Sequence, residues 1–193
     1  MLTVAAWGRM TRLQTLTAGA NAMPQSPPQS IPADLLIDAL RQCGCTTVVT
    51  VPDTHQRTLM SAIAAGDQFR MITCATEDEA TTIAAGLWIG GDEPVLLIQH
   101  AGIYASVNTM RGVAMDGHIP LFYLVGLLQR EPDRAPRDSN HSMVKYCEPL
   151  LDTFGVPHEL IDGPDDVPRI PELFRLSRER RGPAAALIGL PTA

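Results

Sequence analysis

The chain has 193 residues, of which 45% are hydrophobic and 19% are charged, and its formal net charge is −6 with a single lysine. These values are typical of one globular domain, and they exclude the clustered basic side chains of a nucleic-acid binder. The longest apolar run, residues 119–128, is interrupted and much shorter than the roughly twenty residues of a membrane-spanning helix. We therefore expect neither nucleic acid nor a membrane as a partner.

The four cysteines do not form a recognisable metal site. Cys43 and Cys45 are not followed by a second pair at zinc-site spacing, so no metal ligand is predicted in this chain. Free thiols without a secretory signal indicate a reducing compartment, and we expect a cytoplasmic protein.

Residues 1–30 differ in composition from the rest of the chain. Their first part carries basic residues but no acid, and their second part is polar and rich in proline. This composition predicts a disordered leader, followed by one domain over residues 31–193. Two alternatives stay open, namely a transit peptide and translation from a start upstream of a natural start at Met23.

From residue 32 onward, helical and strand patterns alternate. Short β-branched or apolar runs predict buried strands at residues 47–51, 70–74, 94–99, 119–125, 157–161 and 183–188. Apolar residues at helical spacing predict helices at residues 32–43, about 55–64, 76–89, 102–115, 142–154 and 165–180. Six strands separated by helices predict an α/β fold, in which a mostly parallel six-stranded sheet is covered by helices on both faces.

Three acids open the helix predicted at residues 76–89. Thr76 and Glu79 have the spacing of a capping box, and Asp78 lies in the first turn, where the helix dipole favours an anion. Glu77 is left over. It shares a helical face with three small residues, Ala80, Thr81 and Ala84. We expect this face to allow close approach of another surface, although a solvated acid would show the same pattern.

This stretch resembles the pyrimidine-binding (PYR) domain of thiamine diphosphate enzymes. That family has a glutamate nine residues before the glycine of an Ala-Ala-Gly-type helix, as Glu77 and Gly86 stand here. Residues 77–87 and 94–102 look most like the alpha subunit of sulfopyruvate decarboxylase and are similar to the matching half of phosphonopyruvate decarboxylase. The resemblance covers essentially everything after residue 31 and implies the PYR-type fold. It also implies that Glu77 is catalytic and bonds the aminopyrimidine ring of the cofactor.

Two turns extend the resemblance. Residues 51–54, Val-Pro-Asp-Thr, match a Val-Pro-Asp-Ser-type turn, and residues 99–102, Gln-His-Ala-Gly, match a Gln-Asn/Ser-Ser-Gly-type turn beside the pyrimidine ring and substrate. The cofactor contacts implied in addition to Glu77 are therefore Pro52, Asp53, Gln99, Ala101 and Gly102. The sequence departs from the family at His55, at His100 and at residues 102–105, which leaves the substrate open.

Polar residues gather at the predicted carboxyl ends of the strands, where open α/β sheets bind ligands. His55 and His100 are our candidates for proton transfer, because histidine both donates and accepts protons near neutral pH. Together with Thr54 and His141 they are also our candidates for binding an anionic substrate. Each histidine alone has an equally simple interpretation as a surface or capping residue.

Half of the cofactor has no binding site in this sequence. The family holds the diphosphate through Mg²⁺ on a Gly-Asp-Gly motif followed by an asparagine, and neither Gly66-Asp67-Gln68 nor Gly91-Asp92-Glu93 fits. The resemblance therefore implies an alpha subunit that works only with a beta subunit carrying the diphosphate and Mg²⁺ site, in a hetero-oligomer of two of each subunit or larger. The implied activity is thiamine diphosphate-dependent decarboxylation of a small anionic 2-oxo acid.

Two other functions stay open on the sequence. A carboligating subunit would use the same cofactor and the same glutamate. A non-catalytic domain that binds a nucleotide or a partner would keep the fold without needing Glu77.

Overall fold

The computed structural model describes residues 30–193. The leader expected at residues 1–30 lies almost entirely outside the described residues, so that expectation and the domain boundary at residue 31 stay predictions. Within residues 30–193, none of the helices has the length and apolar character needed to cross a bilayer.

The six predicted strands form one sheet, which confirms the α/β fold. They are β1 (Thr47–Thr50), β2 (Arg70–Thr73), β3 (Pro94–Gln99), β4 (Phe122–Gly126), β5 (His158–Ile161) and β6 (Ala184–Ile188). Their order across the sheet is β2-β1-β3-β4-β6-β5. Every neighbouring pair is parallel, so the sheet is parallel throughout.

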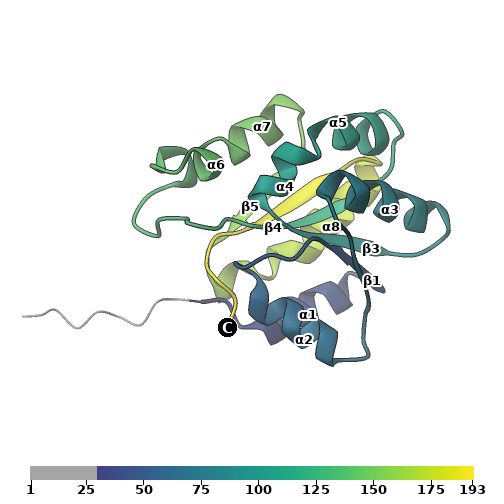
Figure 1. The fold of residues 1–193 in the computed structure, drawn as a ribbon, viewed down its shortest axis with the longest axis horizontal. Helices are drawn as coiled ribbons and strands as arrows, with labels where there is room; N and C mark the ends of the chain where they lie inside the picture. Colours follow the sequence, from purple (N-terminus) through teal and green to yellow (C-terminus); the bar gives the residue numbers. More distant parts are fainter. Residues whose placement is uncertain (1–29) are drawn as a thin grey trace, which may run out of the picture.

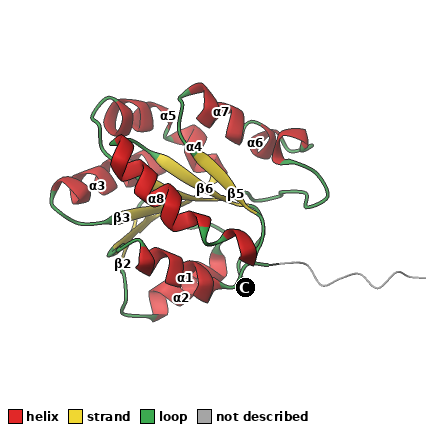
Figure 2. Ribbon diagram, turned by 180° about the vertical axis from the view of Figure 1, so that it is seen from behind, coloured by secondary structure: helices red, strands yellow, loops and turns green. Residues whose placement is uncertain are grey.

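Helices cover both faces of the sheet (Figures 1 and 2). One face carries α1 (Ala33–Gln42), α2 (Arg57–Ala65) and α8 (Arg169–Arg180). The other face carries α3 (Glu77–Ile89), α4 (His100–Ala105), α5 (Val107–Thr109), the π-helical turn η1 (Met110–Met115), α6 (Ser142–Lys145) and α7 (Cys147–Thr153). Two short 3-10 turns, η2 (Pro136–Asp138) and η3 (Pro164–Asp166), complete the helical segments of the described residues.

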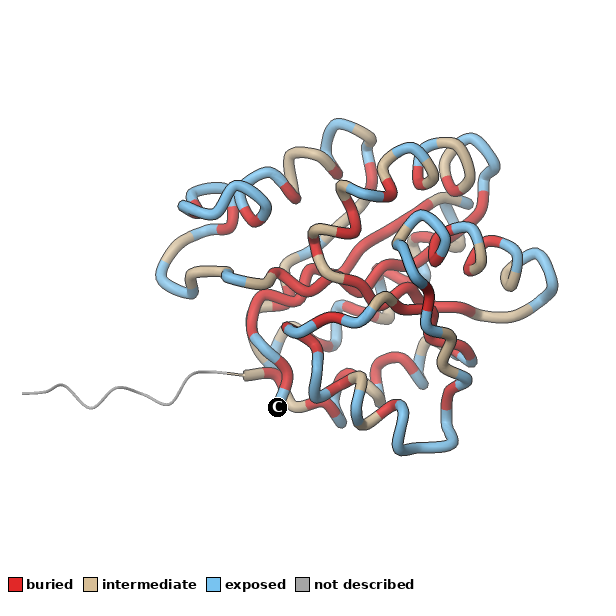
Figure 3. The backbone as a smooth tube through the Cα atoms, in the orientation of Figure 1, coloured by how far each residue is buried: buried red, intermediate tan, exposed pale blue. Residues whose placement is uncertain are grey.

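The core consists of two apolar layers separated by the sheet. Successive side chains of a strand point to opposite faces, so Val95 and Leu97 pack with α1, α2 and α8, whereas Leu96 and Ile98 pack with α3 and η1. The central strands are therefore buried along their length (Figure 3). This explains why they are continuous apolar runs rather than alternating ones.

Prolines account for two differences from the predicted helices. The helix expected at residues 142–154 is divided at Tyr146 into α6 and α7. Pro149 follows this break, and a proline ring collides with the carbonyl four residues before it, here that of Lys145. Pro168 likewise precedes the first residue of α8, so the helix expected from residue 165 begins at Arg169.

The two ends of the described chain meet beside α2 (Figure 1). Backbone hydrogen bonds join the two ends. The Ile31 N–H donates to the Pro191 carbonyl, and the Ala193 N–H donates to the Ile31 carbonyl, both at 3.0 Å. Thr192 N–H donates to the His55 carbonyl at 3.3 Å, and the Thr192 hydroxyl accepts from Leu59 N–H at 3.2 Å. The C-terminal segment thus fixes the loop that follows β1.

Candidate active site

The carboxyl ends of β1, β2, β3 and β4 lie at one edge of the sheet, because all four strands run in the same direction. The loops that follow them carry most of the residues predicted to act on cofactor or substrate. In open parallel sheets this edge is the usual place for a ligand.

Glu77 is the first residue of α3, and its neighbours cap the helix, with Thr76 as predicted and Glu79 reaching back to Ala75 before the N-cap. Thr76 Oγ1 accepts a hydrogen bond from Glu79 N–H at 3.4 Å, and Glu79 Oε2 accepts one from Ala75 N–H at 2.8 Å. Asp78 is exposed, and its pKa is lowered chiefly by a hydrogen bond with the Thr76 side chain. The Glu77 carboxylate is half-buried and has no hydrogen bond or ion pair with any residue in 30–193. It is therefore available to a ligand.

Close approach to Glu77 occurs at Gly102 and not at the small helical face that we expected. Ala80, Thr81 and Ala84 are all 0% exposed, so that face packs inside the protein. The Glu77 side chain instead lies against Gly102 at the start of α4, where an added Cβ would be 2.8 Å from both Glu77 Cδ and Oε1 and closer still to Cγ. The glycine at position 102 is thus required by the position of the glutamate.

Asp53 lies in the loop after β1 and is only 3% exposed. Its Oδ1 accepts hydrogen bonds from His55 N–H at 2.8 Å and from Gln99 Nε2 at 3.0 Å, and its Oδ2 accepts one from Gln56 Nε2 at 3.0 Å. An added Cβ at Gly126, at the end of β4, would collide with the same carboxylate. Asp53 therefore joins the loops after β1 and β3, and cofactor contact by this residue stays a prediction.

His55 and His100 come together around Asp53. They are 7% and 3% exposed, and burial lowers the pKa of both imidazoles, an effect that the nearby Asp53 charge opposes. Both rings are therefore neutral at neutral pH. His100 Nδ1 accepts a hydrogen bond from Ala101 N–H at 3.0 Å, which places the ring proton on Nε2. Neutral imidazoles are suited to moving protons and less suited to pairing with an anion.

His141 is exposed, and it shares no hydrogen bond or ion pair with His55 or His100 among residues 30–193. Its backbone N–H donates to Ser139 Oγ at 3.0 Å. The loop before it is fixed by Arg130, whose side chain is 4% exposed and pairs with Asp162 at 2.5 Å. The same loop is held by Glu131. A hydrogen bond from the Asn140 backbone N–H is the largest cause that lowers the pKa of Glu131 to about 2, and a hydrogen bond from the Ser139 hydroxyl is the next.

A hollow of about 260 Å³ opens beside the loop after β1. It is lined by Pro52, Asp53, Thr54, Arg57, Met60 and Ser61. Thr54 and Arg57 are exposed, and Arg57 has no carboxylate partner in the described part of the chain. Neither Arg57 nor the buried Gln56 was predicted from the sequence, because a polar residue beside a helix start is usually a solvated one.

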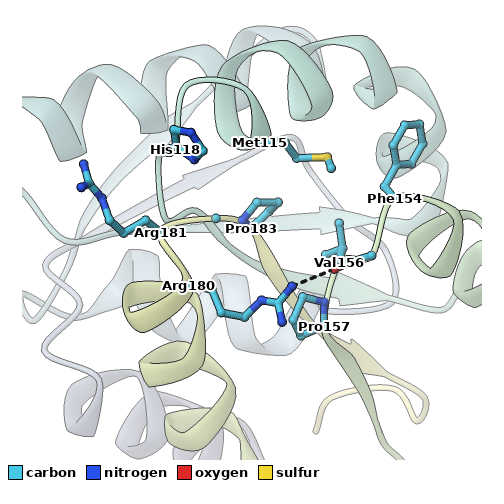
Figure 4. A pocket seen from close by; sticks show the side chains of 10 residues that line it. Met115, His118, Phe154, Val156, Pro157, Arg180, Arg181 and Pro183 are labelled. Carbon is cyan, nitrogen blue, oxygen red and sulfur yellow. Dashed lines mark hydrogen bonds between the residues drawn. The ribbon is translucent and has the colours of Figure 1, made fainter.

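A second hollow, of about 150 Å³, lies at the opposite edge of the sheet (Figure 4). Arg180 reaches toward Val156 and Pro157 in this view, whereas Arg181 points away from them. Both arginines stand at the C-terminal end of α8, where the helix dipole favours cations. None of the predicted site residues lines this hollow.

Comparison with known proteins finds relatives among phosphonopyruvate and sulfopyruvate decarboxylases. The chain is 27% identical over 143 residues to the phosphonopyruvate decarboxylase of Streptomyces viridochromogenes, a match that covers 74% of this chain and 35% of that protein. It is 22% identical over 157 residues to the sulfopyruvate decarboxylase subunit alpha of Methanococcus maripaludis, covering 81% of this chain and 93% of the subunit. The corresponding subunit of Methanocaldococcus jannaschii is 25% identical over 126 residues, 63% of this chain and 71% of that one.

The chain thus spans about a third of the length of the phosphonopyruvate decarboxylases that it matches, and nearly all of one sulfopyruvate decarboxylase alpha subunit. Residues 32–146, more than half of the chain, match the family described as thiamine pyrophosphate enzyme, N-terminal TPP binding domain. These residues include Glu77, Gly102 and the loops that hold Asp53, His55 and His100. The chain therefore belongs to the N-terminal, TPP-binding domain family of thiamine pyrophosphate enzymes.

Proposed function

We propose that this chain is the alpha subunit of a thiamine diphosphate-dependent 2-oxo acid decarboxylase and that it is active only with a beta subunit. The observation that carries the proposal is the half-buried carboxylate of Glu77 at the strand-end edge, which has no partner among residues 30–193 and lies against a glycine that leaves room for it. The names of the relatives and the near-complete coverage of one alpha subunit support the same assignment.

The residues at this edge fit the pyrimidine half of the cofactor. Glu77 would hold a proton at a nitrogen of the aminopyrimidine ring, and Pro52, Gln99, Ala101 and Gly102 would contact the ring from the neighbouring loops. When bound, thiamine diphosphate supplies a carbon nucleophile and a sink for the electrons released with CO₂. The burial of His55 and His100 favours neutral imidazoles that move protons at the substrate.

The diphosphate and its Mg²⁺ are assigned to the beta subunit. The two segments with partial similarity to the metal motif, Gly66-Asp67-Gln68 and Gly91-Asp92-Glu93, precede β2 and β3 and so lie at the edge opposite Glu77. Asp92 is moreover engaged by Thr46, Thr47 and Arg70. In residues 30–193, no group of three histidine, cysteine or carboxylate side chains is placed to hold a metal ion.

We expect the purified chain alone to bind thiamine diphosphate more weakly than about 1 μM and to release no CO₂, because most of the cofactor's charge lies in the diphosphate. Calorimetric titration with thiamine diphosphate and Mg²⁺ measures the affinity, first for the chain alone and then with its partner subunit. Sub-micromolar binding by the chain alone would contradict the assignment of the diphosphate site.

We further propose that Arg57 binds the anionic tail of the substrate, with Thr54 beside it and His141 as a third candidate. A sulfonate or phosphonate tail requires a cation, and His55 and His100 are neutral. Arg57 lines the hollow next to the strand-end loops and is not neutralised by a carboxylate of the described chain. The substrate class is therefore a 2-oxo acid with a second acidic group.

Arg57→Gln in the assembled enzyme is expected to lower kcat/KM for 3-sulfopyruvate or 3-phosphonopyruvate by about tenfold to hundredfold, since a hydrogen bond to a charged group contributes about 1.5–3 kcal/mol. The value for pyruvate should stay the same. Arg181→Gln is the matched control, because it removes the same charge at the opposite edge of the sheet. A similar loss with pyruvate, or with the control variant, would exclude Arg57 as the ligand of the tail.

The proposal as a whole is tested by co-expression with the protein of the neighbouring open reading frame, co-purification, and measurement of CO₂ release from 3-sulfopyruvate, 3-phosphonopyruvate and simple 2-oxo acids. Product analysis distinguishes decarboxylation from carboligation, which would use the same residues.

The four cysteines are free thiols, which supports a cytoplasmic location.

A further inference from the structure

Gln56 is fully buried although it directly precedes α2. Its Nε2 lies 3.0 Å from Asp53 Oδ2 and 3.2 Å from the backbone carbonyls of both Ile98 and Leu124. All three neighbours are acceptors, so only the NH₂ end of the carboxamide fits this position. Gln56 therefore ties the loop after β1 to the carboxyl ends of β3 and β4.

Asp53 receives this donor together with two others. The His55 N–H and Gln99 Nε2 both donate to Oδ1, so three donors converge on one carboxylate. Both oxygens of Asp53 must therefore accept hydrogen bonds, as the two oxygens of an ionised carboxylate do. Gly126 leaves the space into which Oδ2 projects. The position of the carboxylate is thus determined by groups from β1, β3 and β4 at once.

The two buried histidines lie on the loops that this carboxylate joins, since Asp53 Oδ1 bonds the backbone N–H of His55 and the side chain of Gln99, the residue before His100. The ring of His55 lies beside the backbone of Ile188 and Leu190, and the ring of His100 lies beside the backbone of Leu128 and near His55. Asp53 is the negatively charged group that acts on both rings. His55 Nε2 is fully buried and has no hydrogen-bond partner in the described structure.

We infer that Gln56 is a positioning residue: it holds the Asp53 carboxylate, and through the bonds of that carboxylate to the His55 backbone and to Gln99 it fixes the two loops that carry His55 and His100 for proton transfer at this edge. The catalytic consequence rests on the proposed function. The placement of the Asp53 carboxylate by Gln56 does not rest on the proposed function, because it can be measured on the chain alone.

The test is an NMR titration of the imidazoles in the full chain, with His141 and His158 as internal references. Gln56→Met keeps the length of the side chain and removes the donor to Asp53. Without that donor Asp53 Oδ2 loses its hydrogen bond from Gln56, and the carboxylate is held only through Oδ1. It therefore shifts, its negative charge favours the protonated forms of the two rings less, and the pKa values of His55 and His100 fall below those of the wild type. Asp53→Asn should cause the same downward shift directly.

The inference is overturned if the pKa values of His55 and His100 in a folded Gln56→Met protein equal those of the wild type. This includes the case in which only Asp53→Asn lowers them. If Gln56→Met does not fold, the same titration is done on Gln56→Asn. The shorter side chain keeps the amide but places it one methylene farther from Asp53. An equal shift of His141 or His158 would indicate a general structural change and would likewise count against a positioning role.

In the assembled enzyme, Gln56→Met is expected to lower kcat by up to about 100-fold with little change in KM, as a small misplacement of acting groups does. The acidic limb of the pH profile of kcat should move to lower pH together with the two imidazoles. If the wild-type assembly releases no CO₂ from any 2-oxo acid, the proposed function fails. The NMR titration then still decides whether Gln56 positions Asp53.

Discussion

Glu77→Gln is expected to reduce turnover of the assembled enzyme by about 10³-fold to 10⁴-fold, the upper part of the range for general acid–base catalysis. A carboxyl group at this position exchanges a proton with a ring nitrogen of the cofactor, and an amide of the same size does not. The Glu77 side chain has no hydrogen bond or ion pair with residues 30–193. Fold, melting temperature and subunit assembly should therefore be unchanged.

The measurement is hydrogen–deuterium exchange at C2 of bound thiamine diphosphate, followed by proton NMR after acid quench. Glu79→Gln is the matched control two residues away. Its side chain accepts a hydrogen bond from Ala75 N–H, so this variant should lose on the order of 1 kcal/mol of stability as a weakened helix cap and keep most of its activity. Wild-type exchange in the Glu77 variant, or an inactive Glu79 variant, would mean that the roles of the acids in this turn are assigned wrongly.

Gly102→Ala is expected to lower turnover by up to about 100-fold, because the methyl group occupies space that the Glu77 side chain fills. The clash is with a side chain and not with backbone, and it begins at Cγ, so the glutamate must change its χ1 rotamer and leave its position while the fold remains. The loss should therefore appear in activity and in the C2 exchange rate.

Gly86→Ala is the control for the general effect of adding a methyl group. Gly86 lies in the same helix as Glu77, and an added Cβ there would meet nothing within 4 Å. This variant should gain about 0.5–1 kcal/mol of stability from the better helix propensity of alanine and keep full activity. Equal activity of the two glycine variants would show that the contact between Gly102 and Glu77 does not position the carboxylate.

The sequence by itself determined the secondary-structure elements, and it singled out Glu77 as a candidate. Buried strands and amphipathic helices depend on residues close in the chain, and so does the helix cap of Thr76 and Glu79, which does not use Glu77. The entirely parallel sheet follows from the alternation of these elements.

The tertiary structure decided how the strand-end residues meet. Asp53 and Gln99 are 46 residues apart, and they bond because β1 and β3 are neighbours in the sheet. The same packing buries Gln56, which the sequence presents as an ordinary polar residue before a helix. It also makes His55 and His100 neutral, because desolvation outweighs the Asp53 charge. Burial and charge depend on what surrounds a side chain from all directions, and local sequence patterns contain no information about neighbours contributed by distant segments.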